Sequence, residues 1–287
     1  MTVTLLGTGS PVPGIERFGM STLIEAGGTK LLIDCGRGAL QRLRQLALPL
    51  GTVDKLFLTH LHSDHLVGLP DLWLSAWVAG RDTPLRVWGP QGTVNMMEHL
   101  AQAFQPDIMM RRDMDTRLPA AGIEFVAQDI QSSFVFEESG FRLSTFDVEH
   151  IPEVPSFGFR VEYEGRSVVL SGDARQSENL VTHAQGADLL IHEVVAPEAR
   201  RAARSGRTTD FIVDQIVAHH TTPQQAGEVF SRVRPKLAVY SHIVGPFGDA
   251  TINEINIGTA ETYDGPFVIG HDLMSIEVGE EVRVVEA

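Results

Sequence analysis

Seven consecutive residues near the end of the first quarter of the chain concentrate metal-binding side chains. Residues 59–65 read Thr-His-Leu-His-Ser-Asp-His. Neutral imidazole and carboxylate are the ligands that Zn²⁺ prefers when it keeps a coordination position open for catalysis. His60 and His62 are two residues apart and can point the same way, whereas Asp64 and His65 are adjacent and must diverge. One loop with two ligand directions predicts a site for two metal ions rather than one.

The segments on either side of this loop indicate how its ligands could be presented. Residues 53–58 (VDKLFL) form a short apolar run that suits a buried strand. After the histidines, apolar side chains recur at helical spacing up to residue 78, behind the Gly68-Leu69-Pro70-Asp71 start. The sequence therefore predicts that residues 59–65 connect a strand to a helix.

The rest of the chain alternates short strand-like runs with helical stretches. Helices are predicted at residues 38–46, 93–104, 210–219 and 223–233. Strands are predicted at residues 3–6, 22–26, 30–33, 85–88, 123–126, 134–137, 141–148, 157–163, 167–170, 189–192, 237–240, 273–278 and 282–285. Groups of strands separated by helices appear in two halves, which predicts an α/β fold with two sheets packed together and helices outside. We expect residues 1–287 to form a single domain.

Composition narrows the class of protein. The chain has 287 residues, 43% of them hydrophobic, and a net charge of −14. No apolar run reaches the length of a membrane span, and the single cysteine, Cys35, agrees with a reducing compartment, so a cytoplasmic protein that does not bind membranes is expected. Such an acidic surface repels phosphate backbones and makes nucleic acid a disfavoured partner.

Two further motifs, taken with the metal loop, resemble those of a known family. Residues 6–13 read LGTGSPVP and residues 32–36 read LIDCG. Over nearly its whole length the chain resembles the metallo-β-lactamase-fold hydrolases, and within them the branch of ribonuclease Z and the zinc-dependent arylsulfatases. The resemblance implies a four-layer αββα sandwich of two mixed β-sheets flanked by helices, with two zinc ions at one edge. It also implies a homodimer.

The resemblance assigns the metal ligands position by position. His60, His62 and His150 would bind one zinc, and Asp64, His65 and His242 would bind the other. Asp173, in the segment LSGDAR of residues 170–175, would bridge the two ions. Asp34 would orient a ligand histidine through its second ring nitrogen. Imidazole and carboxylate also accept Mn²⁺ or Fe²⁺, so the residues do not single out the metal.

Catalytic roles follow from the same resemblance. Two zinc ions can share a bridging hydroxide that attacks the scissile bond, and we count the ligand Asp64 among the catalytic residues. Glu193 and His220 resemble a pair that passes a proton to the leaving oxygen. His219 is adjacent to His220 and is the alternative for that role.

The substrate is where this chain departs from the family. The common bacterial ribonuclease Z has a long tRNA-gripping arm between two strands, where this chain has only the Glu164-Gly165 turn. We therefore expect a small-molecule ester substrate, of the aryl sulfate or phosphodiester type. The alternatives are a ribonuclease Z-like tRNA 3′-processing endonuclease, a lactonase-type hydrolase, and a non-catalytic metal-dependent sensor. Trp73, Trp77 and Phe18 could line an aromatic-accepting pocket, although core packing explains both tryptophans equally well.

Overall fold

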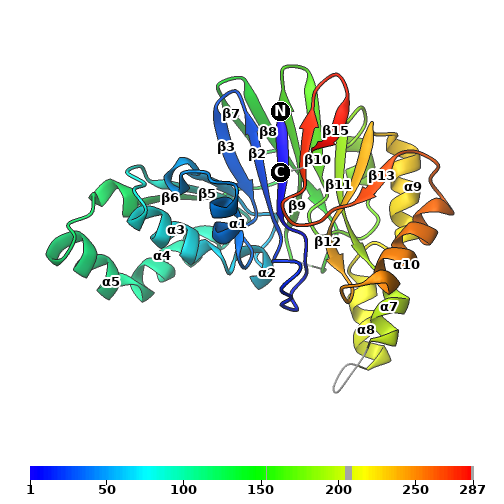
Figure 1. The fold of residues 1–287 in the computed structure, drawn as a ribbon, viewed down its shortest axis with the longest axis horizontal. Helices are drawn as coiled ribbons and strands as arrows, with labels where there is room; N and C mark the ends of the chain where they lie inside the picture. Colours follow the sequence, from blue (N-terminus) through cyan, green and yellow to red (C-terminus); the bar gives the residue numbers. More distant parts are fainter. Residues whose placement is uncertain (153, 204–208, 286–287) are drawn as a thin grey trace.

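Two β-sheets packed face to face form the centre of the molecule, with helices on both outer sides (Figure 1). The computed structural model describes residues 1–152, 154–203 and 209–285. Within these ranges the first sheet has eight strands, in the order β15 (Val282–Val285), β14 (Ser275–Val278), β1 (Thr2–Gly7), β2 (Ser21–Ala26), β3 (Thr29–Ile33), β4 (Lys55–Phe57), β5 (Leu85–Gly89) and β6 (Phe125–Asp129). The second has seven, in the order β13 (Phe267–Ile269), β12 (Leu237–Val244), β11 (Leu189–Val195), β10 (Arg166–Leu170), β9 (Ser156–Tyr163), β8 (Phe141–Val148) and β7 (Val135–Glu138).

Each sheet is mixed. In the first sheet β3, β4, β5 and β6 are parallel neighbours, while β15, β14, β1, β2 and β3 pair antiparallel. In the second sheet β10 to β13 run parallel and β7 to β10 pair antiparallel. The prediction of two mixed sheets flanked by helices is confirmed.

The helices are divided between the two sheets (Figure 1). The first sheet is covered by α1 (Ala39–Gln45), α2 (Ser63–Leu66), α3 (Leu69–Val78), α4 (Thr93–Ala103) and α5 (Gln105–Met109). The second is covered by α6 (Glu178–His183), α7 (Pro197–Ala202), α8 (Asp210–Ala218), α9 (Pro223–Val233) and α10 (Asp249–Ala260). In the described ranges no helix is both long enough and apolar enough to cross a bilayer.

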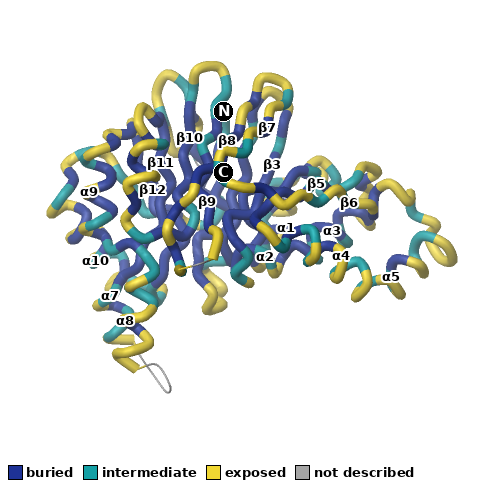
Figure 2. The backbone as a smooth tube through the Cα atoms, turned by 180° about the vertical axis from the view of Figure 1, so that it is seen from behind, coloured by how far each residue is buried: buried dark blue, intermediate teal, exposed yellow. Residues whose placement is uncertain are grey.

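Apolar side chains form three layers, one between the two sheets and one between each sheet and its helices. In Figure 2 the backbone of the central strands is mostly buried, whereas the outer loops and helices are more exposed. Strand β3 shows why: Leu31 and Ile33 face the layer between the sheets, and Leu32 faces the helices of the first sheet. Strand β11 shows the same alternation in the second sheet: Leu189 faces the layer between the sheets, and Leu190 faces the helices of the second sheet. Because successive side chains alternate faces, a strand buried on both sides reads as an unbroken apolar run.

The turn between β9 and β10 has two residues, as the sequence predicts. Tyr163 pairs with Arg166, and Glu164 and Gly165 have φ values of 49° and 72°. Positive φ at both central residues is the geometry of a tight two-residue hairpin. No arm extends from this position.

Strands β11 and β12 are longer than predicted. The sequence predicts that they end at His192 and Tyr240, whereas they continue to Val195 and Val244. The polar residues that interrupt the apolar run are held in the sheet by backbone pairing and not by side-chain pattern. The helices α6 and α10 and the strand β13 are also absent from the prediction, since their short or mixed sequences lack a clear apolar period.

Candidate metal centre

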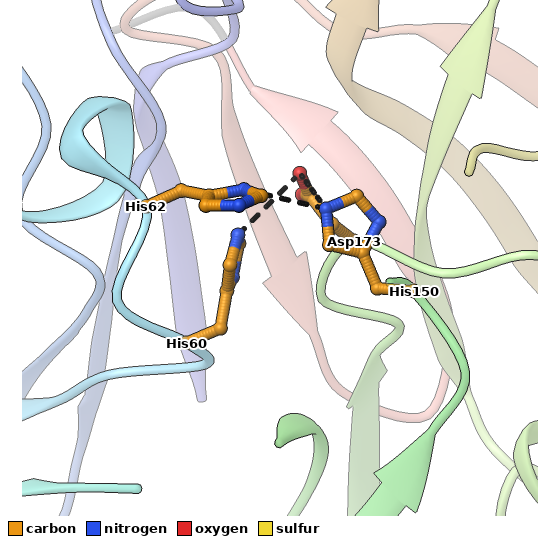
Figure 3. Close-up of side chains that lie close together, drawn as sticks. All are labelled: His60, His62, His150 and Asp173. Carbon is orange, nitrogen blue, oxygen red and sulfur yellow. Dashed lines mark hydrogen bonds and ion pairs between the residues drawn. The ribbon is translucent and has the colours of Figure 1, made fainter. Parts of the chain in front are cut away.

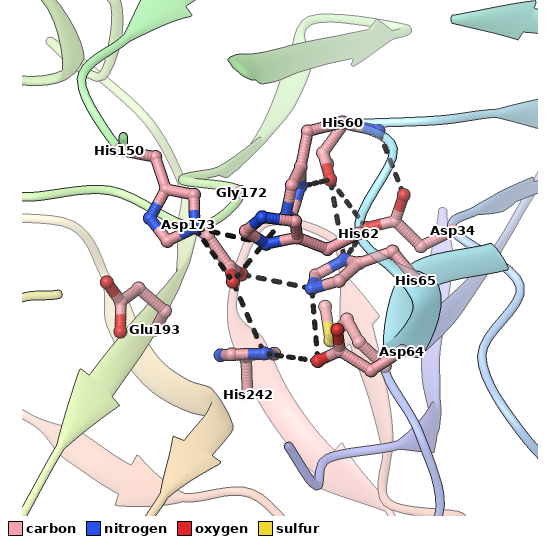
Figure 4. Close-up of polar contacts among 12 residues, drawn as sticks. Asp34, His60, His62, Asp64, His65, His150, Gly172, Asp173, Glu193 and His242 are labelled. Atoms are coloured by element: carbon pink, nitrogen blue, oxygen red, sulfur yellow. Dashed lines mark hydrogen bonds and ion pairs between the residues drawn. The ribbon is translucent and has the colours of Figure 1, made fainter. Parts of the chain in front are cut away.

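Seven histidine and aspartate side chains meet at one edge of the two sheets (Figures 3 and 4). They come from the loop after β4, the start of α2, the loops after β8 and β10, and strand β12. Donor atoms of one group lie within 4.8 Å of one another, and so do those of a second group. The first group is His60, His62, His150 and Asp173, and the second is Asp64, His65 and His242.

Asp173 lies between the two groups. Its Oδ2 is 3.8 Å from Nε2 of His60 and 3.9 Å from Nε2 of His150. The same carboxylate lies 3.3 Å from Nε2 of His65 and 3.4 Å from Nε2 of His242. The structure therefore places the sequence-predicted bridging residue within reach of both groups.

Strained backbone positions aim these side chains. His242 has a φ of 45°, and it lies at a bulge where Ser241 and His242 face the single residue Glu193 of β11. Such a bulge redirects a side chain out of the regular strand alternation. Gly172, directly before Asp173, has a φ of 61°, and a Cβ there would come within 2.4 Å of the Phe157 carbonyl oxygen. Asp34, at the end of β3, has a φ of 59°. Non-glycine residues with such φ values cost energy and cluster at functional sites.

A buried hydrogen-bond relay orients two of the histidines (Figure 4). His65 Nδ1 donates to Asp34 Oδ2 at 2.7 Å, and the Thr59 hydroxyl donates to the same oxygen at 2.9 Å. Because that hydroxyl proton is used, the Thr59 oxygen accepts from His60 Nδ1, which lies 2.9 Å away. Both rings are thereby fixed with Nε2 free. Asp34 lies against His65, one of the predicted ligands. The sequence does not single out Thr59, although its position directly before His60 is a signal that could have identified it.

The third histidine is oriented by the backbone instead. His150 Nδ1 donates to the His219 carbonyl oxygen at 2.8 Å, which directs its Nε2 toward His62, 3.3 Å from the Nδ1 of that ring. The loop after α8 thus holds a ligand of the cluster through its main chain.

Unsatisfied buried atoms show that the cluster fits a cation. Nε2 of His60 and Nε2 of His65 are buried and make no hydrogen bond within the described residues. Leaving such atoms unpaired costs about 1–3 kcal/mol each. Imidazole nitrogens facing shared carboxylates form the donor set of a zinc site. The residues therefore fit two metal ions.

The protonation states suit the same purpose. Burial, together with the nearby His65, lowers the pKa of His60 well below its usual value, so the ring is neutral. Burial acts against ionisation of Asp173, but His242 and His65 outweigh it and hold the pKa of Asp173 well below its usual range. His65 behaves in the opposite way: despite burial, Asp173 and Asp34 raise its pKa well above the usual value. A cation binding at His65 would therefore release a proton.

Glu193 and His220 lie against the cluster. Nδ1 of His220 is 3.1 Å from Oε1 of Glu193, and that oxygen also accepts from the backbone N–H groups of Ala174 and Thr221. The His220 ring lies 5.7 Å from the His242 ring, centroid to centroid. Burial is outweighed by Glu193, which raises the pKa of His220 to about 9. His219 contributes its backbone carbonyl to His150, whereas His220 is the neighbour whose ring pairs with the Glu193 carboxylate.

Comparison with known proteins identifies the family. Residues 1–202 match the family described as anti-Pycsar protein Apyc1. Ribonuclease Z of Mycobacterium bovis (strain BCG / Pasteur 1173P2) is 33% identical over 285 residues, which cover 97% of this chain and 98% of that protein. The chain belongs to the metallo-β-lactamase-fold hydrolases. Within them it belongs to the Apyc1 family and is similar throughout to ribonuclease Z.

Solved structures agree on the fold of this hydrolase. The metallo-β-lactamase fold protein YhfI from Bacillus subtilis superposes with a TM-score of 0.73 at 18% identity, covering 97% of this chain and 99% of that one. Human tRNase Z, short form, gives a TM-score of 0.69 at 23% identity, covering 97% and 100%. At these identities the likeness establishes the fold alone.

The aromatic residues predicted to line a pocket do not lie at the metal centre of the hydrolase. Trp73 and Trp77 are 1% and 0% exposed, and both pack in the layer between the first sheet and its helices. Their indole N–H groups donate to the carbonyl oxygens of Ile123 and Pro119. They are buried because the i, i+4 spacing puts both on the face of α3 that is turned toward the core. Neither tryptophan therefore faces the metal centre, and Trp73 instead borders a separate cleft that it shares with residues of α4 and α5.

Phe18 is also absent from the cleft beside the site. Its ring lies under the Arg42 guanidinium of α1, 4.1 Å from the centroid. This cleft, of about 400 Å³, is instead lined by the loop that precedes Phe18, by α7 and by the segment after His242. Its walls are Gly9, Ser10, Val12, Pro13, Gly14, Glu16, Arg17, Arg200, Ala203, Ile243, Gly245, Pro246 and Phe247.

Proposed function

We propose that this hydrolase is a two-metal phosphodiesterase that cleaves RNA, in the manner of ribonuclease Z. The observation that supports this most directly is the Glu193–His220 pair beside the seven-residue cluster. The similarity to proteins named ribonuclease Z over nearly the full length of both chains supports it independently.

The metals proposed are two zinc ions, with Mn²⁺ or Fe²⁺ as possible substitutes for the same donors. His60, His62 and His150 would hold one ion, Asp64, His65 and His242 the other, and Asp173 both. When bound, the ions would supply Lewis acidity and lower the pKa of water to about 7. The protein's own part is to orient the imidazoles, which the Thr59–Asp34 relay and the His219 carbonyl do.

His220 would supply the proton for the leaving group. Its raised pKa of about 9 keeps the ring protonated at neutral pH, and Glu193 holds Nδ1, which leaves Nε2 to donate. A ribose alkoxide is a poor leaving group and requires a proton, whereas a phenolate leaves readily without one. A built proton donor therefore favours an RNA phosphodiester over an aryl sulfate.

The short turn at Glu164-Gly165 does not count against RNA as strongly as the sequence suggests. The Mycobacterium bovis ribonuclease Z is covered over 98% of its length by this chain. A protein covered to that extent has no room for a long arm that this chain lacks. The short turn is therefore compatible with a ribonuclease Z-like activity, which is the better supported of the two substrate hypotheses.

A small phosphodiester is the second candidate, and the net charge of −14 favours it. A strongly acidic protein repels the RNA backbone at long range, whereas a small substrate bears few charges and is less affected. Hydrolysis of an aryl sulfate or of a lactone is tested in the same experiment.

The test compares four substrates: a precursor tRNA, bis-p-nitrophenyl phosphate, p-nitrophenyl sulfate and a homoserine lactone, each with and without chelator. We expect chelator-sensitive cleavage of the precursor tRNA at its 3′ side. His220→Asn should slow that cleavage at least about 100-fold while slowing the nitrophenyl phosphodiester much less, since general acid catalysis contributes about 10²–10⁴-fold.

Metal content, measured by plasma mass spectrometry, should not change in His220→Asn. Cleavage of the small phosphodiester with none of the tRNA would transfer the proposal to the second candidate. Turnover of the sulfate or the lactone alone would reject both.

A further inference from the structure

One charged side chain in the cleft beside the metal centre, that of Arg200, has no ion-pair partner among the residues that the structure describes. Arg200 is on α7, and its Nε is buried without a hydrogen-bond partner in the parts of the chain that the structure describes. Its neighbour Arg201 pairs with both Glu198 and Asp214. Burial lowers the pKa of the Arg200 guanidinium, and no carboxylate compensates for it. A half-buried guanidinium without a counter-charge is costly unless an anion binds there.

The position of the cleft relates this charge to the metal centre. Ile243, which lines the cleft, directly follows the predicted ligand His242. The N–H of Ile243 donates to the Thr8 carbonyl oxygen at 2.9 Å, which fixes the Gly9–Ser10 wall beside it. On the α7 side, Ala196 donates its N–H to the Val244 carbonyl oxygen at 3.1 Å. The cleft therefore opens directly alongside the sheet edge that holds the cluster.

The other charged groups of the cleft are either held by the protein or do not pair with Arg200. Arg17, a second cation, donates to the Thr8 hydroxyl and to the Gly270 carbonyl oxygen, so its guanidinium is fixed by the protein itself. Glu16 lines the cleft and forms no ion pair with Arg200 among the described residues. The exposed ring of Phe247, 62% accessible, provides an apolar wall. Phe247 lies beside Arg17, whose Cζ is 5.7 Å from the ring centroid, and Arg200 lines the same cleft. A cleft that presents guanidinium groups and an exposed aromatic ring suits a nucleotide.

We propose that Arg200 binds a phosphate group of the substrate other than the one being hydrolysed. This rests on the proposed phosphodiesterase function and names what the cleft adds to it: preference for a substrate with a second phosphate, as in an RNA strand. The guanidinium presents a planar fork that matches phosphate oxygens, and burial strengthens the interaction. Arg200 would thus partly offset the repulsion that the acidic surface exerts on RNA.

The test is a pair of neighbouring substitutions, Arg200→Met and Arg201→Met, measured on the metal-loaded protein. Substrates are a short oligoribonucleotide, which has several phosphates, and bis-p-nitrophenyl phosphate, which has one. Arg200→Met should raise KM for the oligoribonucleotide at least about 10-fold and leave KM for the small diester within about twofold. Because one phosphate contact to a single strand is lost, the slope of log KM against log salt should fall by about 0.7. Arg201→Met should change neither, and Arg200→Lys should retain part of the affinity.

An equal effect of Arg200→Met on both substrates, or no effect on either, would overturn the proposal. Binding provides a readout that does not depend on turnover: calorimetric titration with adenosine 3′,5′-bisphosphate should show weaker binding to Arg200→Met than to Arg201→Met. If wild type cleaves neither phosphodiester, the proposed function fails, and the titration still decides whether Arg200 binds phosphate. Equal bisphosphate affinity in the two variants would reject that role.

Discussion

The two sheets contribute to the metal centre in different ways. The first sheet supplies four of the proposed ligands, His60, His62, Asp64 and His65, from one continuous segment formed by the loop after β4 and the start of α2. The second supplies His150, Asp173 and His242 from separate segments that the chain brings together only by folding. The means of orientation also differ, because the first group uses a buried side-chain relay and His150 uses a backbone carbonyl. One half of the site is thus a local property of the sequence, and the other half is a property of the topology.

The largest effect should come from the one residue that joins the halves. Asp173→Ala removes a carboxylate within 3.9 Å of histidines from both sheets. We expect loss of metal from both groups and a fall in phosphodiesterase activity of at least about 1000-fold, since a two-metal site depends on both ions acting on the same bond. Metal content and turnover of bis-p-nitrophenyl phosphate check this.

Glu149→Gln is the matched control, because this exposed carboxylate is next to His150 and pairs only with Arg175 among the described residues. It should leave both measurements unchanged. Retention of two metals per chain in Asp173→Ala would mean that the halves of the site are independent, contrary to the comparison above.

The same contrast explains how far the sequence predicts the structure. The proposed ligands in residues 59–65 can be identified from the sequence, because side chains so close along the chain are also close in space. His150 and His242 could be assigned only through resemblance, because no local pattern distinguishes a ligand histidine from a structural one. The bulge that aims His242 depends on two residues facing one across β11 and β12, and neighbour pairing of that kind is not encoded in either strand alone.

The substrate side was less predictable for the same reason. Trp73 and Trp77 have the helical spacing of a pocket wall and equally that of a core face, and only the packing of α3 on the sheet decides between them. Arg200 carries no motif at all. Its role follows from the absence of a partner in the described structure, which is a property of the folded surroundings.

A smaller effect is expected from the relay that orients the first group. Thr59→Val removes the hydroxyl between His60 Nδ1 and Asp34 Oδ2 while keeping the shape of the side chain. Loss of such an outer hydrogen bond costs about 10–100-fold in metal affinity. The unpaired groups should also lower the free energy of unfolding by about 1–3 kcal/mol. Competition with a chelator of known affinity and urea unfolding measure the two quantities.

Thr59→Ser keeps the hydroxyl and should restore most of the metal affinity. If Thr59→Val binds metal as tightly as wild type, the loop backbone alone orients His60. The first half of the site would then resemble the second in relying on the main chain.

The smallest effect concerns a second place where charges join the two sheets. Lys55 of β4 and Arg86 of β5 pair with Glu138 of β7, with N–O distances of 2.9 Å and 2.8 Å. Although partial burial acts in the other direction, these two cations lower the pKa of Glu138. Because the folded pKa lies below the unfolded value of about 4.3, the pairing stabilises the fold above that pH and the contribution is lost as pH falls through the folded pKa.

Glu138→Gln should therefore lower the free energy of unfolding at pH 7 by at most about 1 kcal/mol, because the group is partly exposed. The difference from wild type should shrink as pH falls from about 4.3 through the folded pKa, while Glu137→Gln, whose carboxylate pairs with Arg142 of the same sheet, should lower the free energy of unfolding at pH 7 by less than Glu138→Gln does. Urea unfolding over a series of pH values decides the matter: a penalty that stays constant as the pH is lowered would mean that Glu138 acts by packing and not by charge.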